Sequence, residues 1–331
     1  MLDDRKAAIL AALVEEHIAT AAPVSSRAIL ERSELACSSA TVRNDLAVLE
    51  RDGLAAKPHT SAGRIPTEAG YRYYVDHLSP GSLRATTVDR IDDFFTTVHA
   101  EVGKILRETS DLLSDITHYP AVVLGPGLRG HTVRDVHVLP VQPGVVLLVL
   151  VTEAGRVHQS VLRMSVPATP AEVAVAQSLL AEWVVGTSIE DGDLPIEHAE
   201  IDLPEPTQRL VDLALDAVRD AAETGRDIYV GGTSRMVSLW EDLAKLHRIL
   251  ALLEREASVS RLLEGDGDGT TVRLGTEIPT GEDDLAVVST PYHLGSLAGR
   301  MGVLGPLRMD YRRTIRVVEE VSDALGDRTG G

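Results

Sequence analysis

The sequence predicts an α+β protein in which a helical N-terminal head, a linker helix and a mixed domain follow one another. Three observations favour this order. Apolar residues recur at helical spacing up to about residue 116, strand-like runs begin at residue 121, and helical segments interrupt the strands between about residues 167 and 263. A chain of 331 residues is long enough for two or three domains.

The composition is that of a soluble globular protein, with 44% hydrophobic residues and a mean hydropathy of +0.03. The longest apolar run, Val145 to Val151, is far shorter than the ~20 residues of a membrane helix. The first residues carry neither the basic nor the apolar segment of a signal peptide. Cys37 is the one cysteine, which excludes an intrachain disulfide and fits a reducing cytosol, so we expect a cytoplasmic protein.

The net charge of −18 argues against non-specific binding of nucleic acid by the whole chain. Residues 1–80 contain nine Lys and Arg against eleven Asp and Glu, whereas the remaining residues contain 23 against 39. Most of the acidity therefore lies outside the N-terminal head. Aromatic residues make up 3%, too few to suggest stacking on single-stranded nucleic acid.

The head begins with two predicted helices and a turn. An amphipathic helix over residues 3–20 places Ile9, Leu13 and other apolar side chains on one side. Ser25 is placed to cap a second helix that runs to about Arg32. Residues 35–37 form the turn into a third helix.

That third helix spans about residues 38–52. Val42, Leu46 and Leu49 make one buried stripe, which leaves Thr41, Arg43 and Asn44 off it. Gly53 suits the left-handed residue that ends a helix.

A short segment rich in turn formers, residues 54–67, follows and is predicted to be a hairpin. The order of helices, turn, helix and basic hairpin is typical of a winged helix-turn-helix, whose third helix enters the major groove of double-stranded DNA while the hairpin follows the backbone. The alternative is an unrelated small helical domain with a solvated polar face. We predict that the DNA-contacting residues are Ser39, Thr41, Arg43, Asn44, Lys57, His59, Thr60, Ser61 and Arg64.

Beyond the head, residues 68–78 form a helix, residues 79–82 a linker, and residues 85–116 one long helix. That helix is either a spacer or dimer contact, or it packs on its own domain. Strands are expected at 121–124, 133–139, 145–151, 157–164, 228–230, 271–274, 285–290 and 299–304, and helices at 167–185, 205–224, 236–245, 246–263 and 311–325.

No constellation of residues favours catalysis over a structural role. Gly125, Gly127 and Gly130 match a dinucleotide fingerprint, but a strand rather than a helix is predicted to follow, so a turn is the better interpretation. The histidines show no metal-binding spacing, and no nucleophile elbow occurs. We expect a tight turn at 231–234 and an Arg–Asp pair at 308–310 that fixes a helix start. The sequence thus predicts no enzyme, no cofactor and no metal.

Three segments carry a resemblance to a known family. They are residues 38–70, with Ser-Ala-Thr-Val-Arg-Asn-Asp-Leu and Pro-His-Thr-Ser-Ala-Gly-Arg-Ile-Pro-Thr, then Leu274-Gly-Thr-Glu277, and Gly305-Pro-Leu-Arg-Met-Asp-Tyr311. Together they resemble the heat-inducible transcription repressors of the HrcA family, whereas residues 80–225 match it weakly. Thr276 stands where an acidic residue is frequent, and the Thr-Gly-Gly tail is unpatterned.

The resemblance implies a winged helix over 1–80, a linker helix over 81–118, a GAF-like domain in two parts (119–189 and 273–331), and an inserted α/β dimerisation domain over 190–272. It further implies a homodimer that represses chaperone operons through an inverted-repeat operator called CIRCE, and a repressor kept active by the GroE chaperonin. The alternatives are a sugar-phosphate-responsive repressor of the DeoR type, which should carry an alternating βα ligand domain, and a GAF-like small-molecule sensor or dinucleotide enzyme.

Overall fold

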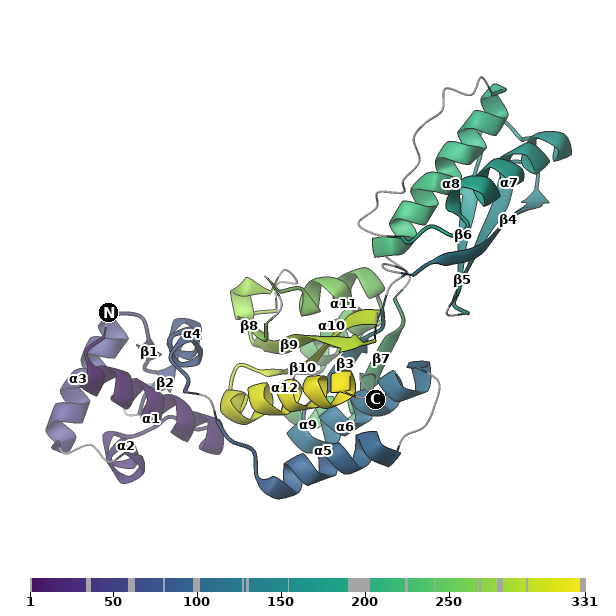
Figure 1. Cartoon of the computed structure of the whole chain (residues 1–331). Helices are drawn as coiled ribbons and strands as arrows, with labels where there is room; N and C mark the ends of the chain where they lie inside the picture. Colours follow the sequence, from purple (N-terminus) through teal and green to yellow (C-terminus); the bar gives the residue numbers. More distant parts are fainter. Residues whose placement is uncertain are drawn as a thin grey trace. The chain divides into compact units, whose positions relative to one another are not determined.

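The computed structural model divides into two compact units, each described here by itself (Figure 1). Unit 1 comprises Met1–Val123, Tyr229–Tyr292 and Arg300–Gly331, and unit 2 comprises Leu124–Ile228 and His293–Gly299. The description excludes residues 1, 34–36, 59–62, 80, 98–101, 127, 129–130, 154, 190–202, 224–225, 241, 266, 268, 279–281, 296 and 328–331.

The head is a helical bundle with a short antiparallel strand pair. Its elements are α1 (Asp4–Thr20), α2 (Ser26–Arg32), α3 (Ser39–Arg51), β1 (Ala55–Ala56), β2 (Ile65–Pro66) and α4 (Glu68–Asp76). Each helix starts at a polar cap whose side chain accepts from the backbone N–H three residues later: Asp3, Ser25, Ser38 and Thr67. The head core contains fully buried aliphatic residues from α1, α2 and α3, namely Ile9, Leu10, Leu13, Val14, Ile29, Val42 and Leu49.

The rest of unit 1 is built, within the described residues, on a five-stranded sheet of order β7-β3-β10-β9-β8. These strands are β3 (Ala121–Leu124), β7 (Ile228–Gly231), β8 (Thr271–Leu274), β9 (Leu285–Leu294) and β10 (Leu297–Pro306). The helices are α5 (Ala85–Thr97), α6 (Val102–Thr117), α9 (Met236–Leu239), α10 (Leu243–Leu253), α11 (Glu256–Leu263) and α12 (Tyr311–Asp327). Figure 1 shows α5, α6 and α12 on one side of the sheet and α10 and α11 on the other. β3 and most of β9 are buried because helices cover both faces.

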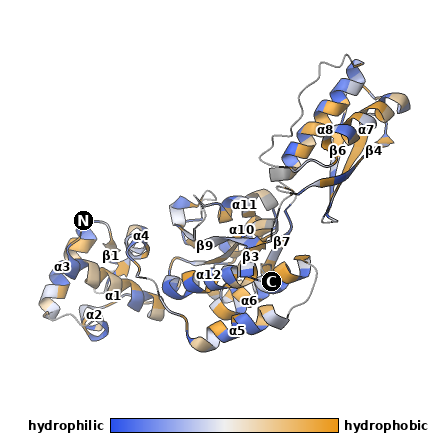
Figure 2. Cartoon of the chain, in the orientation of Figure 1, coloured by the Kyte–Doolittle hydropathy of each residue, from blue (hydrophilic) through white to orange (hydrophobic). Residues whose placement is uncertain are grey.

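Unit 2 is a three-stranded antiparallel sheet of order β4-β5-β6 covered on one face by two helices. Its elements are β4 (Val133–Gln142), β5 (Val145–Thr152), β6 (Val157–Arg163), α7 (Pro170–Val184) and α8 (Glu205–Glu223). Along β5 the buried residues alternate with half-buried ones, as expected for a sheet with one packed face. The second face is also rich in apolar side chains, and Figure 2 shows hydrophobic residues along these strands.

The structure corrects three sequence-based expectations. The helix expected over 85–116 is two helices, α5 and α6, which both pack against α12. The helices expected over 236–245 and 246–263 are instead α9, α10 and α11, and Asp242 caps α10 by accepting from the N–H groups of Ala244 and Lys245. The expected insertion at 190–272 also differs from the observed unit 2, since the segment from Tyr229 to the end of β8 lies in unit 1 and the strands from β4 to β6 lie in unit 2.

The α+β class itself is confirmed, since helices and antiparallel sheets are both present. None of the helices in the described part of the chain combines the length and the apolar character needed to span a membrane.

Candidate nucleic-acid interface

Helix α3 presents one apolar side to the head and one polar side to solvent. Val42, Leu46 and Leu49 are buried, as the sequence predicts. Arg43 and Asn44 are exposed. Thr41 sits at the helix start, where its Oγ1 lies 3.0 Å from Oγ of the capping residue Ser38. The exposed side of α3 therefore offers a fork of guanidinium donors and a carboxamide, which are the groups that read guanine and adenine edges.

Asp45 is a buried acid that the sequence analysis did not assign to the buried stripe. Its carboxylate accepts from Nε of Arg5 at 2.8 Å and from Nη2 of Arg5 at 3.3 Å. The ion pair joins the first turn of α1 to the middle of α3, so it fixes the orientation of α3 within the head. The helical spacing predicts the burial of Asp45, because it follows Val42 by three residues and thus falls on the buried stripe.

The hairpin is held against the loop before α2 as well as by its own strand pair. In the β1–β2 pair, Ala55 lies opposite Pro66 and Ala56 opposite Ile65. Val24 and Arg64 exchange two backbone hydrogen bonds of 2.8 and 2.9 Å. A Cβ on Gly63 would lie 2.2 Å from the carbonyl oxygen of Val24, so only glycine allows this close approach.

A groove of about 330 Å³ lies between α3, the hairpin and the start of α2. Its polar lining is Ser25, Ser26, Arg43, Lys57 and Arg64. Neither Arg43 nor Lys57 has a bonded partner among the described residues, and both are exposed. The structure thus brings three of the predicted contact residues to one concavity and adds two hydroxyls that the sequence reasoning had not selected.

Arg64 differs from the other two cations because it is already paired. Its Nε donates to Oε2 of Glu50 at 2.8 Å, its Nη2 lies 2.7 Å from the same oxygen, and its side chain is 19% exposed. Since Glu50 is in the last turn of α3, this pair ties the hairpin to the helix. Arg64 therefore has a structural role in the free protein that sequence reasoning missed.

The remaining predicted residues divide into two groups. Ser39 is half-buried at the start of α3, and its Oγ lies 3.0 Å from Oγ of Ser26, so it links α3 to α2. His59, Thr60 and Ser61 lie outside the described residues.

The opposite end of the head, helix α4, makes a different set of contacts. The Glu68 carboxylate accepts from the backbone N–H of Thr276 at 3.0 Å and from its hydroxyl at 2.5 Å. Arg72 donates to the carbonyl oxygen of Val272 at 2.8 Å and pairs with Glu277 at 3.2 Å. These bonds connect the head to β8 and to the short 3-10 turn Gly275–Glu277. We call this set the α4 contact.

An aromatic cluster lies beside the α4 contact. Nδ1 of His17 and the hydroxyl of Tyr71 form a 2.7 Å hydrogen bond, and the rings of Tyr71 and Tyr311 pack with centroids 6.1 Å apart. Burial raises the pKa of the Tyr71 phenol, so the hydroxyl stays protonated. Burial, with the charge of Arg308, lowers the pKa of His17 below its usual value.

The other candidate sites have structural explanations. Gly232 has φ of +70° in the turn expected at 231–234. Asp310 caps the start of α12 by accepting from the N–H of Arg313 at 3.2 Å, whereas the expected pair with Arg308 is not among the ion pairs of the described residues. Strand β4 follows the glycines at 125–130, as the interpretation of a turn requires. The described part of the chain contains no cluster of His, Cys, Asp or Glu arranged to hold a metal ion.

Comparisons with known proteins agree with one another. The model of the HrcA protein C terminal domain matches residues 103–315. The heat-inducible transcription repressor HrcA of Halalkalibacterium halodurans is 34% identical over 98% of this chain and 97% of its own length. That of Kineococcus radiotolerans is 37% identical, with 97% of each chain covered. A hypothetical protein solved at 2.2 Å resolution superposes with a TM-score of 0.60 at 25% identity, covering 99% of this chain and 97% of its own. The chain belongs to the HrcA family, whose curated members are named heat-inducible transcription repressors.

Proposed function

We propose that the chain is a heat-inducible transcription repressor that acts in the cytoplasm by binding an inverted-repeat operator of the CIRCE type through a winged helix-turn-helix. The observation that supports this most strongly is the groove of about 330 Å³ in a chain of net charge −18, with Arg43 and Lys57, whose side chains have no bonded partner among the described residues. Exposed cations without protein partners are free to meet phosphates and base edges. Because the chain belongs to the HrcA family, we no longer favour the alternative of a DeoR-type repressor.

In this proposal α3 enters the major groove and the hairpin acts as the wing. Arg43 and Asn44 read bases, while Lys57, Thr41 and the hairpin residues His59, Thr60 and Ser61 contact the backbone. Arg64 and Ser39 position the contacting residues, because Arg64 holds the hairpin to α3 and Ser39 holds α3 to α2. Base contacts give specificity, and backbone contacts set the register.

The test of operator binding is fluorescence anisotropy with a labelled inverted-repeat CIRCE duplex. A duplex of the same composition with both half-sites scrambled is the non-specific control, at identical salt concentration. We expect the intact operator to bind at least 10³-fold more tightly than non-specific DNA. Equal affinity for the two duplexes would contradict sequence-specific recognition.

We further propose that the repressor is a homodimer, since one head reads one half-site and an inverted repeat has two. The open face of the β4–β5–β6 sheet in unit 2 is the surface that fits a second copy. One row across it joins Leu139, Leu147 and Val161, and a parallel row contains Val151 and Val157. Leu139, Val157 and Val161 are 48%, 57% and 59% exposed, which is costly for aliphatic side chains unless another apolar face covers them.

The dimer is tested by analytical ultracentrifugation of Val161→Asp at micromolar concentration. A two-fold contact brings two introduced carboxylates into one apolar interface, so we expect a monomer with weakened operator binding. Val175→Asp, on the exposed side of α7, is the matched control and should remain dimeric. If Val161→Asp remained dimeric, the interface would lie elsewhere, for instance in the segment 190–272 that the family resemblance implies.

The heat response is proposed to pass through the folding state of the repressor, with GroE chaperonin returning it to the active form. Domains are only about 5–15 kcal/mol stable, and the 3% aromatic content leaves most of the core to aliphatic side chains. We expect operator occupancy to fall during a heat step and to recover with chaperonin and ATP. Occupancy that persists through the heat step and ignores chaperonin would remove this part of the proposal.

A further inference from the structure

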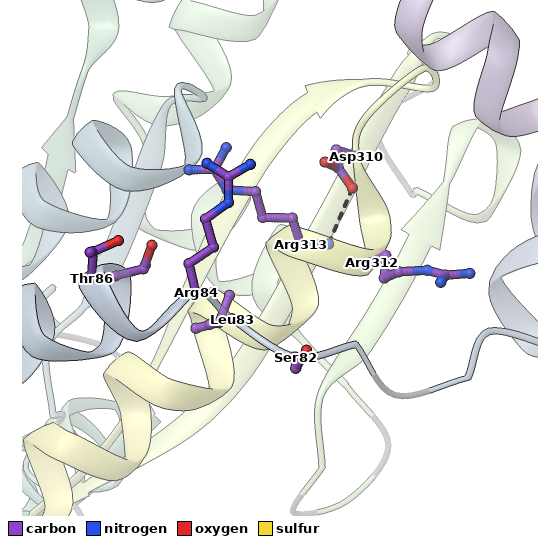
Figure 3. A pocket seen from close by; sticks show the side chains of 8 residues that line it. Ser82, Leu83, Arg84, Thr86, Asp310, Arg312 and Arg313 are labelled. Carbon is purple, nitrogen blue, oxygen red and sulfur yellow. Dashed lines mark hydrogen bonds between the residues drawn. The ribbon is translucent and has the colours of Figure 1, made fainter.

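A cavity of about 390 Å³ lies where the segment that follows the head meets the start of α12. Its polar lining comes from Ser82, Arg84, Thr86 and Thr87 on one side and from Asp310, Arg312 and Arg313 on the other (Figure 3). Three arginines and one carboxylate therefore line this cavity in a chain whose overall charge is −18. This concentration of positive charge calls for an explanation.

The protein's own acids account for only part of that charge. Arg312 extends away from the other two arginines in Figure 3, and its Nη2 lies 3.3 Å from Oε1 of Glu15. Asp310 is occupied in part as the cap of α12, through the 3.2 Å bond from the N–H of Arg313. Neither acid neutralises Arg84.

Arg84 and Arg313 keep donors available. The side chain of Arg84 is exposed and has no bonded partner among the described residues, while its backbone carbonyl accepts from the N–H groups of Thr87 and Val88 at the start of α5. Arg313 uses Nη2 to donate to the carbonyl oxygen of Ile116 at 2.9 Å, and its other guanidinium nitrogens have no bond within the described chain. Figure 3 shows the side chains of Arg84 and Arg313 extending to the same side of the cavity. Two guanidinium forks that share a cavity repel each other unless an anion lies with them.

Hydroxyl donors complete the lining. Thr86 and Thr87 belong to the first turn of α5, where the partial positive charge of a 13-residue helix adds to that of the arginines. We propose that this cavity binds a small phosphate-bearing anion, held by the guanidinium groups of Arg84 and Arg313 and by the hydroxyls of Thr86 and Thr87. Planar guanidinium forks match the oxygens of phosphate in pairs, which is the reason for choosing phosphate over a monovalent ion.

Because of where the cavity lies, an anion bound in it would join two segments that are far apart in the sequence. Arg84 lies on the segment that leaves the head, and Arg313 lies on α12. The segment already approaches α12 closely, since a Cβ on Gly81 would lie 2.8 Å from Cγ of Arg312. An anion shared by Arg84 and Arg313 therefore fastens this segment to α12.

The experiment is isothermal titration of the full-length protein, without DNA, in a buffer free of phosphate. Inorganic phosphate and pyrophosphate are the probes, and sodium chloride at matched ionic strength is the comparison. We expect saturable binding of at least one phosphate probe and none of chloride. Arg84→Ala should weaken that binding about tenfold or more, the range for one charge-assisted contact.

Arg90→Ala is the matched control because it removes an arginine from α5 that is paired with Asp115 at 3.4 Å and does not line the cavity. It should bind the probe as the parent does. The Arg84 side chain has no partner among the described residues, and the bonds from Thr87 and Val88 go to its backbone carbonyl, so we expect the substitution to leave the fold intact, which circular dichroism checks. Absence of saturable binding, or equal binding by the parent and Arg84→Ala, would overturn the proposal.

The same variants separate this site from the operator-binding surface. If Arg84→Ala weakened operator binding in phosphate-free buffer as strongly as Arg43→Ala, then the cavity would hold a DNA phosphate and the small-anion proposal would be wrong. We expect no such loss. Operator binding by the parent protein does not depend on this result, so the two proposals fail separately.

Discussion

The two ends of the head use their cations in opposite ways. At the groove formed by α3 and the hairpin, Arg43 and Lys57 are exposed and have no partner among the described residues. At the α4 contact, Arg72 is bonded to the carbonyl of Val272 and to the carboxylates of Glu277 and Asp76. A cation already bonded to carboxylates must lose those bonds before it can meet a phosphate, whereas an unpaired one only sheds water.

The difference teaches that the count of basic residues is a poor guide to the surface we propose for DNA binding in this acidic protein. The head as a whole has slightly more acidic than basic residues. What distinguishes the groove is that two of its cations, Arg43 and Lys57, have no bonded partner among the described residues. Arg64 shows this most clearly, because it lines the groove but is paired with Glu50.

The largest effect is expected for Arg43→Ala. If Arg43 reads a guanine in the major groove, its loss should cost about 1–3 kcal/mol of operator affinity and relax base preference at one position of each half-site. Anisotropy titrations with a set of singly substituted operators measure both effects. An Arg43→Ala variant with parental affinity and base preference would break the assignment of α3 as the reading helix.

A smaller effect is expected for the pair Arg64–Glu50. Since each residue holds the other, Arg64→Ala and Glu50→Gln should weaken operator binding to a similar extent by loosening the hairpin. Each should also lower stability by about 0–1 kcal/mol, the range for a partly exposed ion pair. Glu50→Gln removes a negative charge near DNA, so tighter binding by that variant would show that Arg64 is a direct phosphate contact instead.

The α4 contact should hardly affect DNA affinity. Glu68→Gln and Arg72→Ala remove bonds to Thr276 and Glu277, so we expect faster amide exchange in α4 and around residues 272–277. Hydrogen exchange by mass spectrometry follows both segments, and Arg27→Ala, on an exposed pair with Glu31, is the control. If amide exchange were unchanged in both variants, the α4 contact would not stabilise the packing of α4 against residues 272–277.

Acid should weaken the aromatic cluster beside the α4 contact by a small amount. The folded-state pKa of His17 is below its usual value of about 6.5, so the unfolded chain binds more protons between the two values and stability falls as the pH drops through that window. His17→Gln should flatten this dependence. Burial likewise lowers the pKa of His131 in unit 2, so the comparison is made in a His131→Gln background. Thermal unfolding across the window measures the difference, and identical pH profiles would contradict it.

Much of the head could be predicted from the sequence, because its signals are local. The caps Ser25 and Ser38, the stripe of Val42, Leu46 and Leu49, and the turn at Gly53 each act within a few residues. The division into units could not be predicted this way. Sheet membership depends on pairing between distant strands, such as β3 beside β7 and β10, and no local pattern reports it.

The sequence could predict which residues form the candidate site, but it could not predict which of their side chains are already bonded to other residues. Helical spacing identifies Arg43 and Asn44 as exposed, but nothing local indicates that Arg64 pairs with Glu50 across the head. The same holds for the cavity of Arg84 and Arg313. Its residues lie more than two hundred positions apart, and the sequence alone suggested no ligand pocket.

The most direct test of the contrast between the two ends is the salt dependence of operator binding for Lys57→Ala and Arg72→Ala. Each phosphate contact contributes about 0.9 to the slope of log affinity against log salt concentration. We predict that Lys57→Ala lowers the magnitude of this slope by about 0.9 per head, while Arg72→Ala leaves it unchanged. A slope that falls for Arg72→Ala and stays constant for Lys57→Ala would contradict the account.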